Sequence, residues 1–109
     1  MSNNKSLVNT NTIMLILHLL EDEDMYGYQM IEELEKKSNN IFSLKAGTLY
    51  PLLHDLEKKG YVKSYDNSSE GARIRKYYSI TKEGKKSLFE KKNQWKEYTD
   101  AINLVMQEV

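Results

Sequence analysis

Apolar residues at helical spacing predict two helices in the first third of the chain. Residues 9–20 carry apolar side chains on nearly every helical face, which is typical of a helix buried on several sides. Residues 26–37 place apolar groups on one side and charged groups on the other, as in a surface helix that packs on a core. Its inward stripe consists of Gly27, Met30, Ile31 and Leu34. Residues 38–40 predict a turn, and we expect Ile41 and Phe42 to anchor that turn in the core.

A third helix is predicted within residues 45–59, with Gly60 as its stop. Its apolar face follows i, i+3, i+4, i+7 spacing and consists of Leu49, Leu52, Leu53 and Leu56. Pro51 would disrupt a helix interior, because proline lacks an N–H group and clashes with the preceding turn. We therefore expect the regular helix to begin near residue 47 or 48, which leaves Pro51 in the first turn.

Two short stretches rich in strand-forming residues, 61–65 and 74–80, predict a β-hairpin. The polar residues 66–71 join them as a loop. An isolated hairpin is only marginally stable, so this one must pack against the helices. Tyr78 and Ile80 share one face of the second strand and are predicted to point inward.

The end of the chain predicts one long helix that Thr81 caps and that runs to about residue 107. Apolar residues recur along it with heptad spacing at Leu88, Trp95, Ile102 and Val109, with Tyr98 and Val105 between them. A helix of this length cannot bury such a seam against its own small domain. We therefore expect it to pair with a second copy of the chain, which the apolar groups on the other side of the first helix, such as Met14, would also contact.

The predicted order of elements is that of a mainly α fold with a small β-hairpin, a winged helix-turn-helix domain at residues 1–81 followed by a dimerisation helix at residues 82–109. An α-helix fits the major groove of B-form DNA, and its N-terminal residues reach base edges. We therefore expect double-stranded DNA to be bound by the side of the third helix opposite its leucines and by the cations of the hairpin. The candidates on these two elements are Lys45, Thr48, Tyr50, Pro51, His54, Arg73, Arg75 and Lys76, and Tyr26 at the start of the second helix is a further candidate.

Two plainer interpretations of these residues stay open. A solvated helix face would show the same polar residues, and Asp55 and Glu57 favour it toward the C-terminal end of the helix. Charges on a hairpin also serve to block unwanted strand pairing.

The charges of the chain are unevenly distributed although their formal sum is +0. Residues 1–35 carry one lysine against seven acidic side chains, and residues 36–92 carry fourteen Lys and Arg against six. Residues 93–109 carry one lysine against three acids. A basic middle fits a protein with one surface for an anion, although uneven surface charge alone would look the same.

The sequence excludes several other kinds of protein. It contains no cysteine, so a disulfide framework, a thiol nucleophile and a thiolate metal site are excluded. The longest apolar run is too short to cross a bilayer and the polar N-terminus lacks the features of a secretory signal, so a cytoplasmic protein without a membrane partner is expected. Neither His18 nor His54 belongs to a catalytic or metal-binding motif, and we expect no enzyme and no cofactor.

Three blocks of the sequence resemble the signature blocks of PadR-like transcriptional regulators. They are Tyr26-Gly27-Tyr28, residues 47–60 (GTLYPLLHDLEKKG) and residues 75–84 (RKYYSITKEG). The chain is similar to the compact members of that family, which end after a single C-terminal helix. The resemblance implies a homodimeric repressor whose two recognition helices enter successive major grooves of a roughly palindromic operator.

The resemblance also implies a site for a small-molecule effector. Some compact members bind planar aromatic compounds between the subunits, near a tryptophan that corresponds to Trp95. The residues assigned to an effector site or a dimer interface are Met14, Leu88, Trp95, Tyr98, Ile102 and Val105. Because Trp95 also lies in the heptad seam, packing without a ligand stays an alternative for it. A winged-helix module that binds protein rather than DNA is the alternative function, which Lys45 and the hairpin cations disfavour.

Overall fold

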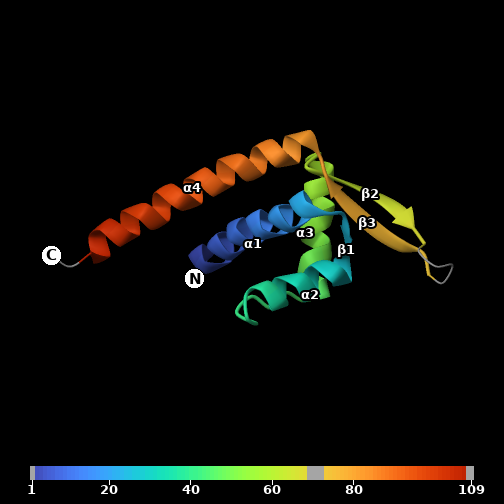
Figure 1. Ribbon diagram of the computed structural model, residues 1–109, viewed down its shortest axis with the longest axis horizontal. Helices are drawn as coiled ribbons and strands as arrows, with labels where there is room; N and C mark the ends of the chain where they lie inside the picture. The colour runs from blue at the N-terminus through green and yellow to red at the C-terminus, as the bar shows by residue number, and fades with distance from the viewer. Residues whose placement is uncertain (1, 69–72, 108–109) are drawn as a thin grey trace.

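The computed structural model describes the backbone of residues 2–68 and 73–107, with side chains from residue 11 onward. These residues form an elongated molecule with principal extents of 61, 29 and 28 Å (Figure 1). The elements are α1 (Ser2–Asp22), β1 (Met25–Tyr26), α2 (Gly27–Lys37), α3 (Ala46–Lys58), β2 (Val62–Asn67), β3 (Arg75–Ile80) and α4 (Lys82–Met106). The predicted mainly α fold with a small hairpin is therefore confirmed.

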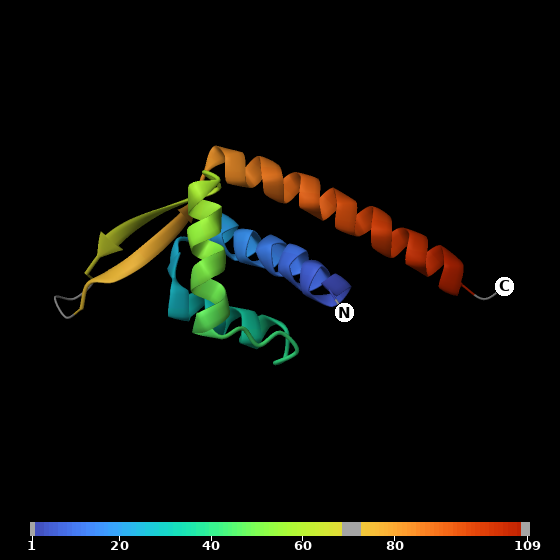
Figure 2. The same cartoon turned by 180° about the vertical axis from the view of Figure 1, so that it is seen from behind.

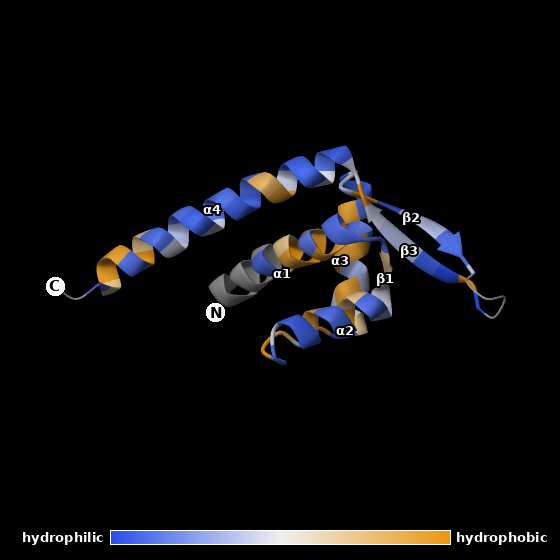
Figure 3. Cartoon of the chain, viewed as in Figure 1, coloured by the Kyte–Doolittle hydropathy of each residue, from blue (hydrophilic) through white to orange (hydrophobic). Residues whose placement is uncertain are grey.

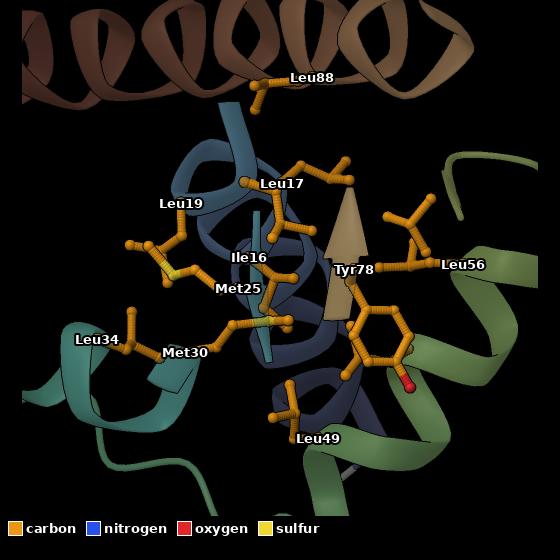
Figure 4. Packing of buried hydrophobic residues seen from close by; sticks show 13 residues of the cluster. Ile16, Leu17, Leu19, Met25, Met30, Leu34, Leu49, Leu56, Tyr78 and Leu88 are labelled. Atoms are coloured by element: carbon orange, nitrogen blue, oxygen red, sulfur yellow. The ribbon is translucent and has the colours of Figure 1, made fainter. Parts of the chain in front are cut away.

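The core forms around α1, which contacts α2, β3 and α4. Figure 4 shows Ile16, Leu17 and Leu19 of this helix among side chains of α2, α3, α4, β1 and β3. The remaining buried residues are Leu20, Met25, Met30, Leu34, Leu49, Leu53, Leu56, Val62, Tyr78 and Leu88. Burial on several sides explains why apolar residues cover most faces of α1, as the sequence predicts.

A third strand, β1, was not predicted from the sequence. The sheet has the order β1-β3-β2, and β1 pairs antiparallel with β3 through Met25↔Tyr78 and Tyr26↔Tyr77. As a consequence α2 begins at Gly27 rather than at Tyr26. A strand of two residues has no alternation to detect, so only its pairing with β3 defines it.

The turn after α2 is confirmed, but its predicted hydrophobic anchor is wrong. Asn39 and Asn40 adopt left-handed conformations with φ of 52° and 66°, which asparagine tolerates better than most residues. The Ser38 hydroxyl accepts a hydrogen bond of 3.0 Å from the N–H of Phe42 and so closes the turn locally. Ile41 and Phe42 remain 77% and 46% exposed, because the local polar closure does not require them in the core.

Pro51 lies deeper in α3 than predicted. The helix begins at Ala46, so Pro51 occupies the second turn instead of the first. Its missing N–H group would have bonded to the carbonyl of Gly47. Gly47 is exposed and has open space beside its Cα, so water can reach that carbonyl. A carbonyl that is open to solvent is not left without a hydrogen-bond partner, which lowers the cost of the interior proline.

The end of α3 is joined tightly to the start of α4. Gly60 stops α3 with φ of +79°, as predicted. The Thr81 hydroxyl accepts a bond of 3.0 Å from the N–H of Gly84 and donates one of 2.6 Å to the Gly60 carbonyl, which confirms the predicted cap. The Thr81 N–H also donates to the carbonyl of Tyr61 at 3.0 Å. A Cβ at Gly84 would collide with that same carbonyl, so glycine is required for this close approach.

From this junction α4 runs back along α1 and extends past it, while the hairpin projects at the opposite end (Figure 2). Most of α4 is hydrophilic, but hydrophobic residues gather at its C-terminal end, away from the body of the domain (Figure 3). None of the helices in residues 2–68 and 73–107 has the combined length and apolarity needed to span a membrane.

Candidate nucleic-acid interface

One side of α3 faces solvent along its whole length. Leu49 and Leu53 are fully buried, which turns the opposite side outward. The outward positions predicted from the leucine spacing are exposed, namely Lys45, Thr48, Tyr50, Pro51 and His54. The structure thus presents a convex helical surface, at the edge of the domain, that an external partner can reach.

The N-terminus of α3 is suited to bind an anion. Lys45 is the N-cap residue and makes no side-chain hydrogen bond to the first turn. The side chain of Lys45 therefore does not occupy the first N–H groups of α3, and the positive end of the helix dipole is available to an external anion. In α4, by contrast, the Thr81 side chain accepts a hydrogen bond from the first turn. Lys45, at the N-cap position, adds a positively charged side chain to this end of the helix. Phosphate groups are favoured at such a helix start.

Tyr50 lies over the beginning of α2. A Cβ at Gly27 would stand only 2.5 Å from the Tyr50 hydroxyl oxygen, so the ring packs where α2 has no side chain. Tyr50 is nevertheless 46% exposed. Its ring therefore lies between α2 and α3, while nearly half of the residue stays exposed to solvent.

The acidic residues of α3 are engaged within the chain. Asp55 forms an ion pair of 3.0 Å with Lys59, one turn later on the helix. Glu57 accepts a hydrogen bond of 2.6 Å from the hydroxyl of Ser64 on β2. Both lie in the C-terminal half of the helix, so the surface attractive to an anion is limited to the N-terminal half.

The hairpin cations lie at one end of the hairpin but not on one face. Arg75 and Lys76 are successive residues of β3, and successive side chains of a strand point to opposite faces. Lys76 shares its face with the buried Tyr78, whereas Arg75 shares the outer face with Tyr77. Arg73 precedes β3 and is exposed, whereas residues 69–71 of the predicted loop lie outside the described residues. The single cationic cluster expected from the sequence is therefore divided between two faces.

Three tyrosines form a row across the outer face of the sheet. Only Tyr26 was a predicted site residue, and Tyr65 and Tyr77 were not singled out from the sequence. Tyr77 of β3 lies between Tyr26 of β1 and Tyr65 of β2, with ring centroids 5.4 Å and 5.8 Å away. The guanidinium carbon of Arg75 lies 4.5 Å from the centroid of the Tyr26 ring. Arg75 and Tyr77 are two residues apart on a predicted strand, so strand alternation places them on the same face. That spacing was the signal that could have identified this group.

A second surface, on α4, carries a series of exposed apolar residues. These include Trp95 at 52%, Tyr98 at 62%, Ile102 at 42% and Val105 at 83% exposure. Leu88 is different, because it is 1% exposed and packs in the core of its own chain. Its assignment to an effector or dimer interface is wrong, since the heptad spacing continues into the domain core at that point. Val109, the last residue of the predicted seam, lies outside the described residues.

A groove of about 680 Å³ separates α4 from α1. Its walls include Met14, Leu15 and His18 of α1, Trp95 and Thr99 of α4, and Phe42 of the turn after α2. Lys92 of α4 and Glu21 of α1 form an ion pair of 3.2 Å between the same two helices. The volume is in the range of sites for drug-sized ligands. Phe42 was expected in the core, and its exposure instead makes it available to this groove.

The described residues contain no cluster of three or more histidine or acidic side chains that could hold a metal ion. Burial is the main cause that raises the pKa of the Tyr78 hydroxyl, which therefore stays protonated and neutral at physiological pH.

Comparison with known proteins identifies what this arrangement resembles. The family model described as the transcriptional regulator PadR-like family matches residues 16–90. A transcriptional regulator of Mycobacterium tuberculosis, Rv3488, is 36% identical over 75 residues, which cover 69% of this chain and 66% of that protein. The structure of a transcriptional regulator from Clostridium thermocellum has a TM-score of 0.83 at 32% identity and covers 94% of this chain and 99% of its own. A PadR family transcription regulator from Clostridium difficile has a TM-score of 0.74 at 36% identity, covering 87% and 97%.

Proposed function

This chain belongs to the PadR-like family and is a DNA-binding transcriptional regulator, and we propose that it represses transcription as a homodimer bound to a palindromic operator in the cytoplasm. The observation that carries the proposal is the exposed start of α3, where Lys45 and uncapped N–H groups face solvent. In our proposal this end of α3 enters the major groove, and Thr48 and Pro51 reach base edges there. In the same proposal Tyr50 and His54 contact the sugar-phosphate backbone of the DNA beside that groove.

The hairpin adds contacts to the DNA on either side of the groove. Arg73, Arg75 and Lys76 are exposed at its outer end, and each carries a charge suited to phosphate. Because Arg75 and Lys76 lie on opposite faces, we propose that they contact different phosphates rather than the same one.

The apolar residues of α4 support the homodimer. Trp95, Tyr98, Ile102 and Val105 are all exposed in the single chain, and contiguous apolar surface of this kind marks an interaction site. A second α4 of identical sequence offers a self-complementary partner, as a twofold-symmetric interface requires. Two copies of α3 held by such an interface would match the symmetry of a palindrome.

The groove between α1 and α4 supports an effector site within this dimer. Its aromatic walls, Trp95 and Phe42, suit a planar apolar molecule, and His18 offers a polar contact. In our proposal such a ligand alters the angle between α1 and α4. The tight Thr81 junction then transmits that change to α3 and releases the DNA.

A protein-binding module is a second candidate, because Ile41 and Phe42 are exposed at the turn after α2. Selection from a random duplex library, followed by fluorescence anisotropy with the selected site, separates the two functions. We expect a palindromic site, and affinity that falls on the order of a thousandfold between about 50 and 200 mM salt, because a dimer would place several cations on phosphates. Enrichment of no sequence, together with no binding at low salt, would favour the protein-binding module.

Repression is tested separately by transcription in vitro. A template with the selected site inside its promoter should give fewer transcripts when the protein is added. A rise in transcript number would contradict the repressor part of the proposal and leave DNA binding in place.

A further inference from the structure

The row of tyrosines on the outer face of the sheet has a defined geometry at every step. Tyr65, Tyr77 and Tyr26 occupy neighbouring strands in register, Tyr65↔Tyr77 and Tyr26↔Tyr77. The Tyr65 and Tyr77 rings are stacked with an interplanar angle of 20°, whereas Tyr77 and Tyr26 meet edge to face at 70°. Both arrangements are favourable for aromatic pairs. The Tyr26 ring is therefore supported by the Tyr77 ring, which in turn stacks on Tyr65.

The far end of the row is tied to the chain that precedes β1. The Tyr65 hydroxyl donates a hydrogen bond of 2.7 Å to Asp24. This hydrogen bond is the main cause that raises the pKa of Tyr65, so the hydroxyl keeps its proton at neutral pH. Tyr65 is on β2 and Asp24 adjoins β1, so the bond spans the sheet and limits sliding of the row.

Arg75 uses this row as a support. Its guanidinium lies 4.5 Å from the Tyr26 centroid, well inside the distance at which a cation is attracted to a ring face. Within residues 2–68 and 73–107, no carboxylate forms an ion pair with Arg75. Stacking on a ring engages the flat face of the guanidinium and leaves its in-plane N–H groups available for another acceptor.

We propose that Tyr26 is a positioning residue, which acts on DNA through Arg75 by holding the guanidinium with its N–H edge toward a backbone phosphate. The proposal rests on the DNA-binding function proposed above. A long arginine side chain otherwise loses rotamer freedom when it binds, and the contact of Arg75 with the Tyr26 ring removes part of that loss beforehand. Tyr77 and Tyr65 contribute by fixing the ring of Tyr26.

A double-mutant cycle tests this role. Dissociation constants for the selected duplex are measured by anisotropy for wild type, Tyr26→Leu, Arg75→Gln and the double variant. We expect Tyr26→Leu to weaken binding about threefold for each wing in contact with DNA, as an exposed cation–π interaction predicts. In the Arg75→Gln background the same Tyr26→Leu change should have no effect. Equal losses in both backgrounds would overturn the positioning role.

Tyr26→Phe is the matched control, because it keeps the ring and removes only the hydroxyl. The proposal predicts binding within about twofold of wild type for this variant. A loss as large as that of Tyr26→Leu would show a direct contact by the hydroxyl and would overturn the proposal. If Tyr26→Leu does not fold, Arg75→Lys in the otherwise unchanged chain is measured in its place. Lysine keeps the charge but lacks the flat guanidinium, so it should weaken binding, and unchanged affinity would count against stacking.

The outcomes separate this inference from the proposed function. Failure of the wild type to bind any duplex at low salt removes the DNA-binding function itself. Binding that Arg75→Gln leaves unchanged removes Arg75 from the interface. Weakening by Arg75→Gln without coupling to Tyr26 removes only the positioning role.

Discussion

Leu88 and Trp95 are seven residues apart on α4, and replacing each with alanine should damage different properties of the protein. Leu88 is 1% exposed, so its side chain stabilises the fold of one chain. Trp95 is 52% exposed and, in our account, is covered by the partner. Leu88→Ala should therefore lower the thermal stability, whereas Trp95→Ala should mainly weaken self-association.

The expected sizes follow from burial. A fully buried Leu→Ala change costs about 3 kcal/mol in free energy of unfolding, or roughly 10–20 °C in Tm for a domain of this size. The exposed half of the indole offers about 120 Å², worth up to about 3 kcal/mol if a partner covers it. The dimer has two Trp95 side chains, one from each subunit. If half of this energy appears as affinity, the two together contribute about 3 kcal/mol, which is roughly a hundredfold in the dimer Kd.

The assay combines sedimentation equilibrium with thermal unfolding at two protein concentrations, because association itself raises Tm. Leu88→Ala should melt earlier at both concentrations, and Trp95→Ala should sediment as a monomer at concentrations where wild type is dimeric. The reasoning is refuted if Trp95→Ala dimerises as tightly as wild type, or if Leu88→Ala dissociates without a loss of Tm.

Three further changes test other parts of the account. Lys45→Gln should weaken binding to every duplex and reduce the salt dependence, measured as the slope of log K against log salt, by about 0.9 per copy; Lys86→Gln, an exposed α4 control, should change neither. Gly84→Ala should lower the free energy of unfolding by about 1–3 kcal/mol, because the new Cβ meets a backbone carbonyl. Gly47→Ala is the control: it has open space beside it and should leave the melting temperature unchanged within a few degrees. Equal losses in the two variants would refute the packing argument. The hydrogen bond to a neighbouring carboxylate raises the pKa of Tyr65 in the folded chain. The stability that this bond contributes to the fold is therefore complete below about pH 10 and is lost as pH rises through the folded-state pKa. Wild type should thus lose more stability than Tyr65→Phe between about pH 9 and 11 in denaturant titrations, and parallel curves would contradict the raised pKa.

Features set by local rules could be predicted from the sequence. The leucine spacing of α3 determined which of its sides is buried, and Gly60 and Thr81 marked a helix end and a helix start. Each of these depends on residues within one or two turns of the chain. Local chemistry is sufficient there.

Features set by a distant partner could not be predicted. The strand β1 exists only because β3 lies beside it, and Leu88 is buried only because α4 folds back onto α1. Ile41 and Phe42 are apolar, and composition alone suggested burial, but their turn closes without them. Arg75 shows a third case, because its place on the Tyr26 ring depends on how β3 registers with β1.

Hydroxyl-radical footprinting of the protein on its selected duplex is the most direct test of how two copies of α3 meet DNA. A dimer that inserts each α3 into a major groove should protect two backbone patches whose centres are about one helical turn, or a whole multiple of it, apart. Placement of the two patches should be symmetric about the centre of the palindrome. A single protected patch, or uniform protection without this spacing, would contradict the central claim.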